Sequence, residues 1–440
     1  MNNEMGFHNE PGSRESHTSP LRVAVVGCGA RSAIATLLPT GRAQVTALVD
    51  PQVGSRVALA RQLAETATDP HGPADAAADA AAPSGGPCAA EAAGGAPAEF
   101  DTVGDLLGGA EVDAALVLTP DDTHAEVATT LLRAGVAVYL EKPMTITTGS
   151  ADAVLSAAAE SGSALYVGHN MRHMAVVRTM KEIIDGGQIG RVKAIWCRHF
   201  VGNGGDYYFK DWHAERTRST GLLLQKGAHD IDVIHWLAGA YTERVSAMGG
   251  LTLYDQVSSR RDNSDRRMPE WFDRQAWPPL AQRDLHPVID VEDLSMVHLQ
   301  LAGGIYASYQ QCHYTPDYWR NYTVIGTEGR LENFGDGAGG VVRVWNHRVD
   351  YQPEGDREYP ITGDSRGHGD ADRQCMAEFV AHVAHHAPTA TSPVAARHAV
   401  AAGEAATRSL REGAMPQDVP PLPPGVAAHF DRGTGQPTVK

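Results

Sequence analysis

Two short segments far apart in the chain carry residue types that could do chemistry together. Gly27 and Gly29 follow one apolar run, and Glu141 and Lys142 follow another. In open α/β sheets ligands bind at the carboxyl ends of the strands, where a cation can steady a developing alkoxide. The two segments together indicate an enzyme that binds a nicotinamide dinucleotide and acts on a sugar or polyol hydroxyl.

The glycine segment has the context of a dinucleotide-binding loop, because it follows a strand and opens a helix. Gly27 permits a tight turn, and Gly29 lets the backbone approach a pyrophosphate. Ala30 and Arg31 continue into a helix start, whose N–H donors and positive dipole end favour an anion. The third small position is Ser32, which loosens the packing of strand on helix slightly. We therefore predict cofactor contacts from Gly27, Gly29, Ala30 and Arg31.

Asp50 ends the second apolar run, where a carboxylate accepts hydrogen bonds from the adenosine ribose. A carboxylate there would repel a 2′-phosphate, so NAD is favoured over NADP. Arg31 and Arg56 moderate that preference and leave NADP open. A glycine turn without any ligand is the alternative.

The elements that must position these residues form an alternating pattern of strands and helices. Strands are expected at 21–26, 44–50, 112–118, 136–140 and 164–167, with helices from 32 and at 56–66, 124–134 and 149–161. This pattern predicts an α/β fold that begins with a Rossmann domain at 21–170, a doubly wound parallel sheet. Residues 66–99 contain almost no large apolar side chain, which predicts a disordered insertion. Residues 1–20 read as a disordered tail without a signal peptide.

The pattern changes after residue 170. A helix at 176–185 and strands at 192–200, 296–301, 305–313, 322–325, 329–332 and 341–345 precede a helix at 395–410. These predict a substrate and oligomerisation domain at 171–415, a C-terminal α/β domain with an open, mainly antiparallel sheet, followed by a tail at 416–440. One face of such a sheet needs a cover, which suggests a homodimer or homotetramer.

Composition excludes several classes of protein. The net charge of −16 argues against nucleic acid and anionic membrane surfaces. No apolar run reaches the roughly 18 residues of a membrane span. Five scattered cysteines suit a reducing cytoplasm, and neither they nor the dispersed histidines have the spacing of a metal site.

Three motifs in order make the chain resemble the Gfo/Idh/MocA oxidoreductase family over about residues 21–415. They are Thr119-Pro-Asp-Asp-Thr-His124, Glu141-Lys-Pro143 and Gly227-Ala-His-Asp-Ile-Asp232. The resemblance implies that Thr119 and Pro120 line the nicotinamide ribose, and that Glu141 and Lys142 lie below the nicotinamide. It places His124 near the cofactor, although a structural histidine at a helix start is an equal alternative.

The resemblance also implies that His229 is the general acid/base, since the imidazole pKa lies near the working pH. A buried structural histidine is the alternative. The family usually carries Asp four residues before this His, but this chain has Gln225, which can orient a substrate without exchanging protons. Lys226 resembles a lysine of one subgroup, and either supplies a second cation or pairs with Asp232.

Further substrate contacts are expected from polar and aromatic residues near the interdomain cleft. Asn170 and Arg172 follow a Rossmann strand and suit hydroxyl recognition, unless they form an interdomain salt bridge. Trp212 lies in an aromatic loop that suits sugar C–H surfaces, or that packs on its own domain. The irregular stretch 254–290 receives no role.

Three functions compete. The first is an NAD(P)-dependent dehydrogenase acting on a secondary hydroxyl of a sugar, sugar derivative or cyclitol, with Lys142 and His229 handling the proton. The second is a lyase or glycosidase that oxidises its substrate transiently with tightly held NAD, which the loss of the acid at Gln225 favours. The third is a non-catalytic dinucleotide-binding regulator.

Overall fold

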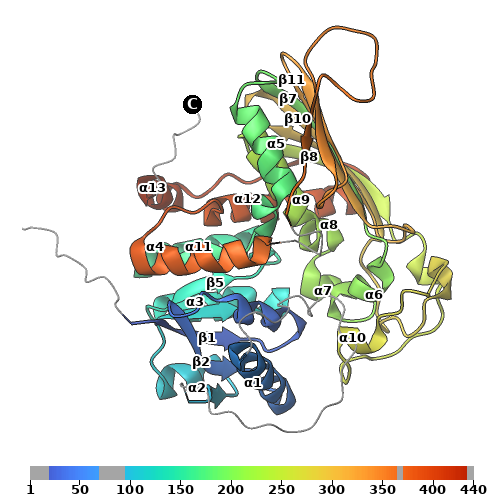
Figure 1. The fold of residues 1–440 in the computed structure, drawn as a ribbon. Coiled ribbons are helices and arrows are strands. Elements are labelled where there is room, and N and C mark those ends of the chain that lie inside the picture. The colour runs from blue at the N-terminus through green and yellow to red at the C-terminus, as the bar shows by residue number, and fades with distance from the viewer. Residues whose placement is uncertain (1–18, 69–94, 364–369, 434–440) are drawn as a thin grey trace, which may run out of the picture.

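The N-terminal sheet is a Rossmann sheet, as the sequence predicts. The computed structural model describes residues 19–68, 95–363 and 370–433. Within these ranges six strands are all parallel in the order β3-β2-β1-β4-β5-β6 (Figure 1). The strands are β1 (Leu21–Val26), β2 (Ala43–Val49), β3 (Ala98–Phe100), β4 (Ala114–Val117), β5 (Ala137–Leu140) and β6 (Leu165–Val167).

Helices cover this sheet because its central strands are apolar on both faces. Every residue of β4 and β5 is buried. The connecting elements are the 3-10 helix η1 (Ala30–Leu37) and the α-helices α1 (Val53–Thr68), α2 (Val103–Gly109), α3 (His124–Arg133) and α4 (Thr148–Ser161). Side chains of Thr102 and Thr147 cap the N-termini of α2 and α4.

The second sheet has nine described strands in the order β14-β13-β12-β11-β7-β10-β9-β8-β15. Only β10 and β7 pair in parallel there, so the predicted open and mainly antiparallel sheet is confirmed. The strands are β7 (Val192–Phe200), β8 (Thr242–Gly250), β9 (Leu294–Leu301), β10 (Ile305–Cys312), β11 (Trp319–Gly326), β12 (Arg330–Phe334), β13 (Val341–Trp345), β14 (Arg357–Pro360) and β15 (Gln417–Asp418).

Helices cover one face of the second sheet and leave the other open. On the covered face lie α5 (Ala175–Asp185), α9 (Gly227–Ala238) and α12 (Pro393–Arg411) (Figure 1). Strands alternate between buried and exposed residues, so Trp196 and Tyr306 remain 55% and 60% exposed on the open face. Large aromatic side chains therefore face outward among polar ones such as Arg198 and Gln310.

One helix within the predicted second domain, 171–415, packs on the first domain. Helix α11 (Ala371–His385) was not predicted, and it packs in the Rossmann core rather than in the second domain. The Phe379 ring lies 5.7 Å from Tyr139 and 6.0 Å from Tyr166, both in the parallel sheet. The second domain at 171–415 is thus interrupted by a helix that completes the first.

The predicted disordered segments also need correction at their edges. Residues 66–68 lie in α1 and 98–99 in β3, so the expected insertion 66–99 is too long at both ends; 69–94 lie outside the described residues. Most of the expected tail 1–20 lies outside them as well. In the tail 416–440, β15 pairs with β8 and α13 (Pro424–Gly433) packs near α4.

The stretch 251–293, between β8 and β9, forms an irregular lobe with its own small core. It contains η5 (Tyr254–Gln256), α10 (Met268–Trp271) and η6 (Pro279–Ala281). Figure 1 shows α10 beside α1 of the Rossmann domain. No helix of the described residues is both long and apolar enough to cross a bilayer.

Candidate active site

The two glycines of the first loop serve different purposes. Gly27 has φ +91°, and a Cβ there would come within 2.8 Å of the backbone of Leu118 at the end of β4. A Cβ on Gly29 would meet nothing within 4 Å. Gly27 therefore allows close strand contact, while Gly29 leaves open space before the first turn of η1, where N–H groups lack intrahelical acceptors. This arrangement fits a dinucleotide pyrophosphate.

Asp50 ties the glycine loop to the end of β2. Its Oδ2 accepts from the Cys28 N–H and its Oδ1 from the Gln52 N–H, both at 2.8 Å. Each carboxylate oxygen keeps a further lone pair, which fits a ribose hydroxyl. The sequence analysis treated Arg56 as a cation that could attract a 2′-phosphate. In the structure Arg56 is paired with Glu99 at 3.0 Å and Asp101 at 2.7 Å.

Arg31 joins three parts of the structure. Its Nε lies 2.6 Å from Oε1 of Glu141, and its two terminal nitrogens lie 2.7 and 2.8 Å from the Asp372 carboxylate on α11. Its guanidinium is therefore neutralised by protein carboxylates. The pair with Glu141 fixes the glycine loop against the turn that carries Lys142.

Lys142 is half-buried at the end of β5, and its backbone N–H donates to Oε2 of Glu141 at 3.0 Å. Among the described residues no group forms a hydrogen bond or ion pair with its Nζ. Burial lowers the pKa of this amine, and Arg31 and Arg320 lower it further. Glu141 and Asp121 oppose that pKa shift. The group can thus exchange a proton nearer neutral pH than a free lysine.

His124 is fully buried and acts as a tether. One ring nitrogen lies 2.9 Å from the Pro143 carbonyl oxygen and the other 2.9 Å from that of Thr119. Thr119 Oγ1 also accepts from the Thr123 hydroxyl at 2.7 Å, and Pro120 is half-buried beside it. His124 therefore holds the predicted nicotinamide-side residues in place, which matches the structural alternative.

His229 and Lys142 share one neighbour, His169. The His169 and His229 rings lie edge to face with centroids 6.3 Å apart. Burial lowers the pKa of His169, and Lys142 adds to the lowering while Asp232 opposes it. The imidazole predicted as general acid/base and the predicted lysine therefore lie around the same side chain, between the two domains.

Gln225 and Lys226 lie next to this group. The helix α8 (Leu222–Gln225) ends there, and α9 starts at Gly227, directly after Lys226. Both side chains are buried, and Lys226 Nζ lies 5.6 Å from the centroid of the Tyr208 ring. Burial, with Arg320 and Lys142, holds the Lys226 pKa well below its usual value. Lys226 does not pair with Asp232.

Arg172 and Asn170 bind protein carboxylates. Arg172 forms a two-pronged ion pair with Asp232, both contacts being 2.7 Å, and also donates to the Ala390 carbonyl at 2.7 Å. Asn170 donates to Asp372 at 2.8 Å. The arginine therefore forms a salt bridge, the kind of contact that the sequence left as the alternative to substrate recognition, but Arg172 and Asp232 both lie within 171–415, so this pair does not join the two predicted domains.

Trp212 packs on its own loop. Its ring stacks on His213 with centroids 3.8 Å apart, and the Arg218 guanidinium lies 5.6 Å from it. His213 in turn faces the buried Asp121 closely enough to lower its pKa. In the aromatic loop, His213 therefore acts on a residue near Lys142, whereas the Trp212 ring packs on His213 and Arg218.

Three residues of this group were missed by the sequence reasoning: Asp121, His169 and Arg320. Asp121 is 5% exposed, its Oδ2 has no hydrogen-bond partner among the described residues, and burial raises its pKa. It lies within the Thr119–His124 motif, and His169 directly precedes Asn170, so position after a strand could have identified both. Arg320 lies on β11, 3.2 Å from Asp230, and no motif in the neighbouring sequence marks it as a site residue.

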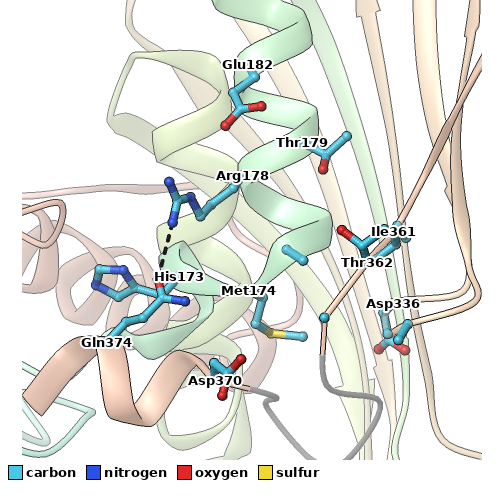
Figure 2. A pocket seen from close by; sticks show the side chains of 14 residues that line it. His173, Met174, Arg178, Thr179, Glu182, Asp336, Ile361, Thr362, Asp370 and Gln374 are labelled. Carbon is cyan, nitrogen blue, oxygen red and sulfur yellow. Dashed lines mark hydrogen bonds between the residues drawn. The ribbon is translucent and has the colours of Figure 1, made fainter.

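A separate cavity of about 240 Å³ lies between α5 and the loops around Asp336 and Ile361. Figure 2 shows that Arg178 and Gln374, 3.2 Å apart, face one another on one side of it. None of the predicted cofactor or catalytic residues lines it. In the described ranges no three acidic, His or Cys side chains gather as metal ligands, and the cysteines found there are free thiols.

Known proteins match both halves of the chain. The model described as "Oxidoreductase family, NAD-binding Rossmann fold" matches residues 21–169, and "Oxidoreductase family, C-terminal alpha/beta domain" matches 181–419; they are the GFO_IDH_MocA pair. The putative oxidoreductase YteT of Bacillus subtilis is 26% identical over 311 residues, 62% of this chain and 73% of that protein.

Two further relatives carry more specific names. An inositol 2-dehydrogenase of Rhizobium meliloti is 30% identical over 166 residues, which are 37% of this chain and 48% of that enzyme. A solved levoglucosan dehydrogenase, complexed with NADH and levoglucosan, is 17% identical with a TM-score of 0.67, covering 91% of this chain and 100% of that one. At this identity the likeness shows a common fold.

Proposed function

Because the chain belongs to the Gfo/Idh/MocA oxidoreductase family, with an NAD(P)-binding Rossmann domain, we propose that it oxidises a secondary hydroxyl of a sugar, sugar derivative or cyclitol. The reverse reaction reduces the matching ketone. Lys142 and His229 handle the hydroxyl proton. When bound, the dinucleotide supplies the hydride acceptor.

The observation that carries this proposal is the gathering of Lys142, His169 and His229 between the domains. A lowered pKa leaves a larger neutral fraction of Lys142, which can accept a hydroxyl proton. As an ammonium, the same group steadies a developing alkoxide. Glu141, itself paired with Arg31, holds the backbone that carries Lys142 in place.

His229 is proposed as the partner that takes or returns the proton as the alkoxide forms and decays. Gln225 orients a hydroxyl by hydrogen bonding, since an amide has donors and acceptors but does not ionise near neutral pH. Asp121 is a buried carboxylate whose pKa is raised by burial, while Lys142 and a hydrogen bond with the Gln225 side chain oppose the rise. We propose that it tunes the Lys142 pKa.

The open face of the second sheet supports self-association. Trp196, Tyr306, Met248 and Met296 are about half or more exposed there, and a hollow of about 620 Å³ opens beside Trp196. Exposed apolar areas of this kind mark interfaces. We propose a homodimer or homotetramer built on this face, working in the cytoplasm.

The test is direct. The purified protein is incubated with NAD⁺ or NADP⁺ and a panel of sugars, anhydrosugars and cyclitols, and reduced cofactor is followed by near-ultraviolet absorbance. Net reduced cofactor with one of them supports the proposal. Turnover without net reduced cofactor supports transient oxidation in a lyase or glycosidase, and no turnover at all supports a regulator.

A further inference from the structure

One arginine of the second domain reaches the Rossmann domain at the adenosine end of the cofactor site. Arg267, at the start of α10, donates from Nη2 to Oγ of Ser55 in the first turn of α1, at 2.8 Å. Figure 1 shows α10 and α1 side by side. The lobe 251–293 therefore spans from one domain to the other.

This contact lies close to Asp50, the residue expected to bind the adenosine ribose. The next residue after Ser55, Arg56, donates to the Asp50 carbonyl oxygen. Burial raises the pKa of the Cys28 thiol to about 12 with help from Asp50, while Arg56 and Arg267 oppose the rise. Asp50, Arg56 and Arg267 thus act on one thiol of the glycine loop.

Arg267 differs from the other arginines of this corner in its charge balance. Arg31 is paired with Glu141 and Asp372, and Arg56 with Glu99 and Asp101. No carboxylate pairs with Arg267 in the part of the chain that the structure describes. Arg267 is exposed, and its other guanidinium N–H groups form no hydrogen bond with the residues that the structure describes. An anionic ligand would supply to Arg267 the negative charge that carboxylates supply to Arg31 and Arg56.

We propose that Arg267 is a specificity-determining residue that binds the 2′-phosphate of NADP, with the Ser55 hydroxyl as a second donor. A guanidinium forms strong charge-assisted hydrogen bonds with phosphate, and an Arg near the ribose is the usual way to accommodate that group. Arg267 then offsets the repulsion by Asp50. The chain binds NADP as well as NAD, although the sequence favours NAD.

Binding can be measured without turnover, so the result does not depend on how Lys142 and His229 act. Dissociation constants for NADP⁺ and NAD⁺ are obtained by calorimetry with the full chain, Arg267→Ala and the control Arg261→Ala. Arg261 lies in the same lobe and pairs with Asp265 at 2.9 Å. Arg267→Ala is expected to weaken NADP⁺ binding about tenfold or more, and NAD⁺ binding less than about threefold.

Arg267→Lys should lie between the wild type and Arg267→Ala, and Ser55→Ala should weaken NADP⁺ binding selectively. Thermal unfolding midpoints confirm that each variant folds. The proposal is overturned if the wild type does not bind NADP⁺, if Arg267→Ala changes neither constant, or if it weakens both dinucleotides equally. Equal weakening of both dinucleotides would indicate that Arg267 holds the two domains together and does not bind the 2′-phosphate.

Discussion

The His169 and His229 rings meet edge to face across the domain boundary, with centroids 6.3 Å apart. His169 follows the last Rossmann strand, whereas His229 lies in the first turn of α9 in the second domain. The charge of Lys142 lowers the pKa of His169, which in turn contacts His229. The proposed chemistry requires this convergence, because the hydride leaves the carbinol carbon and the proton leaves the oxygen bonded to it.

The pH dependence of oxidation should respond to Asp121. In the folded protein this carboxylate raises the Lys142 pKa, although burial lowers the pKa overall. Asp121→Asn removes the opposing charge, so the Lys142 pKa falls further and the neutral amine persists to lower pH. The rising limb of kcat/KM against pH should therefore move to lower pH. Asp122→Asn, which changes the exposed neighbouring carboxylate, should leave the limb in place; a limb that moves to higher pH after Asp121→Asn contradicts this role.

Substitutions of the two loop glycines should have different effects, one on stability and the other on dinucleotide binding. Gly27→Ala places a Cβ within 2.8 Å of the Leu118 backbone at φ +91°, and should lower the free energy of unfolding by about 1–3 kcal/mol. Gly29→Ala meets nothing in the protein and should change stability by less than about 0.5 kcal/mol. It should weaken NAD⁺ binding instead, measured by calorimetry beside chemical denaturation. Similar stability losses in both variants would show that Gly29 is a structural glycine.

The buried ion pair between Arg172 and Asp232 should contribute to the free energy of unfolding. Asp232→Asn leaves a buried guanidinium unmatched and should cost about 3–5 kcal/mol in denaturation experiments. The matched surface change Glu111→Gln, in an exposed pair with Arg22, should cost no more than about 1 kcal/mol.

The Asp232 effect has a defined pH window. Burial by itself would raise the pKa of this carboxyl, but Arg172 and its hydrogen bonds bring it below 3.8. The stability it contributes is therefore fully present above the unfolded pKa and is lost as pH falls through the lower folded pKa. The difference between wild type and Asp232→Asn should shrink only at such acidic pH; a constant difference would indicate that folding does not change the pKa of Asp232.

Assembly should depend on the open sheet face. Trp196→Glu places a charge on β7 where the side chain is 55% exposed, and it should dissociate the assembly without unfolding the subunit. Light scattering after size exclusion measures the mass. Glu328→Gln, at the turn between β11 and β12, serves as a charge-changing control. A wild type that is already monomeric would refute the proposed interface.

Much of the Rossmann half follows from local sequence patterns. Strand, glycine turn, helix and the aspartate after β2 are neighbours in the chain, so their positions could be predicted. The packing of α11 on this sheet could not be predicted, because most of the second domain separates Phe379 from Tyr139 and Tyr166 in the sequence. Local pattern does not encode such a long-range contact.

Pairing partners show the same limit. The sequence placed Arg31 at the cofactor, but it could not reveal Asp372 on a helix that it did not predict. Arg172 could have bound substrate or a carboxylate, and only the fold brings Asp232 to it. Arg320 enters the group from β11, and nothing near it in the chain marks it as different from other arginines.

The most direct test is a double-mutant cycle on Lys142 and His229, using the single-turnover rate of NADH formation with a substrate found in the panel. Lys142→Ala and His229→Ala should each slow this step by about 10² or more while NAD⁺ affinity stays within a few-fold. The double variant should be little slower than the slower single variant, because the two groups act on one proton. Losses that multiply, or a His229→Ala variant as fast as wild type, would contradict joint action at one hydroxyl.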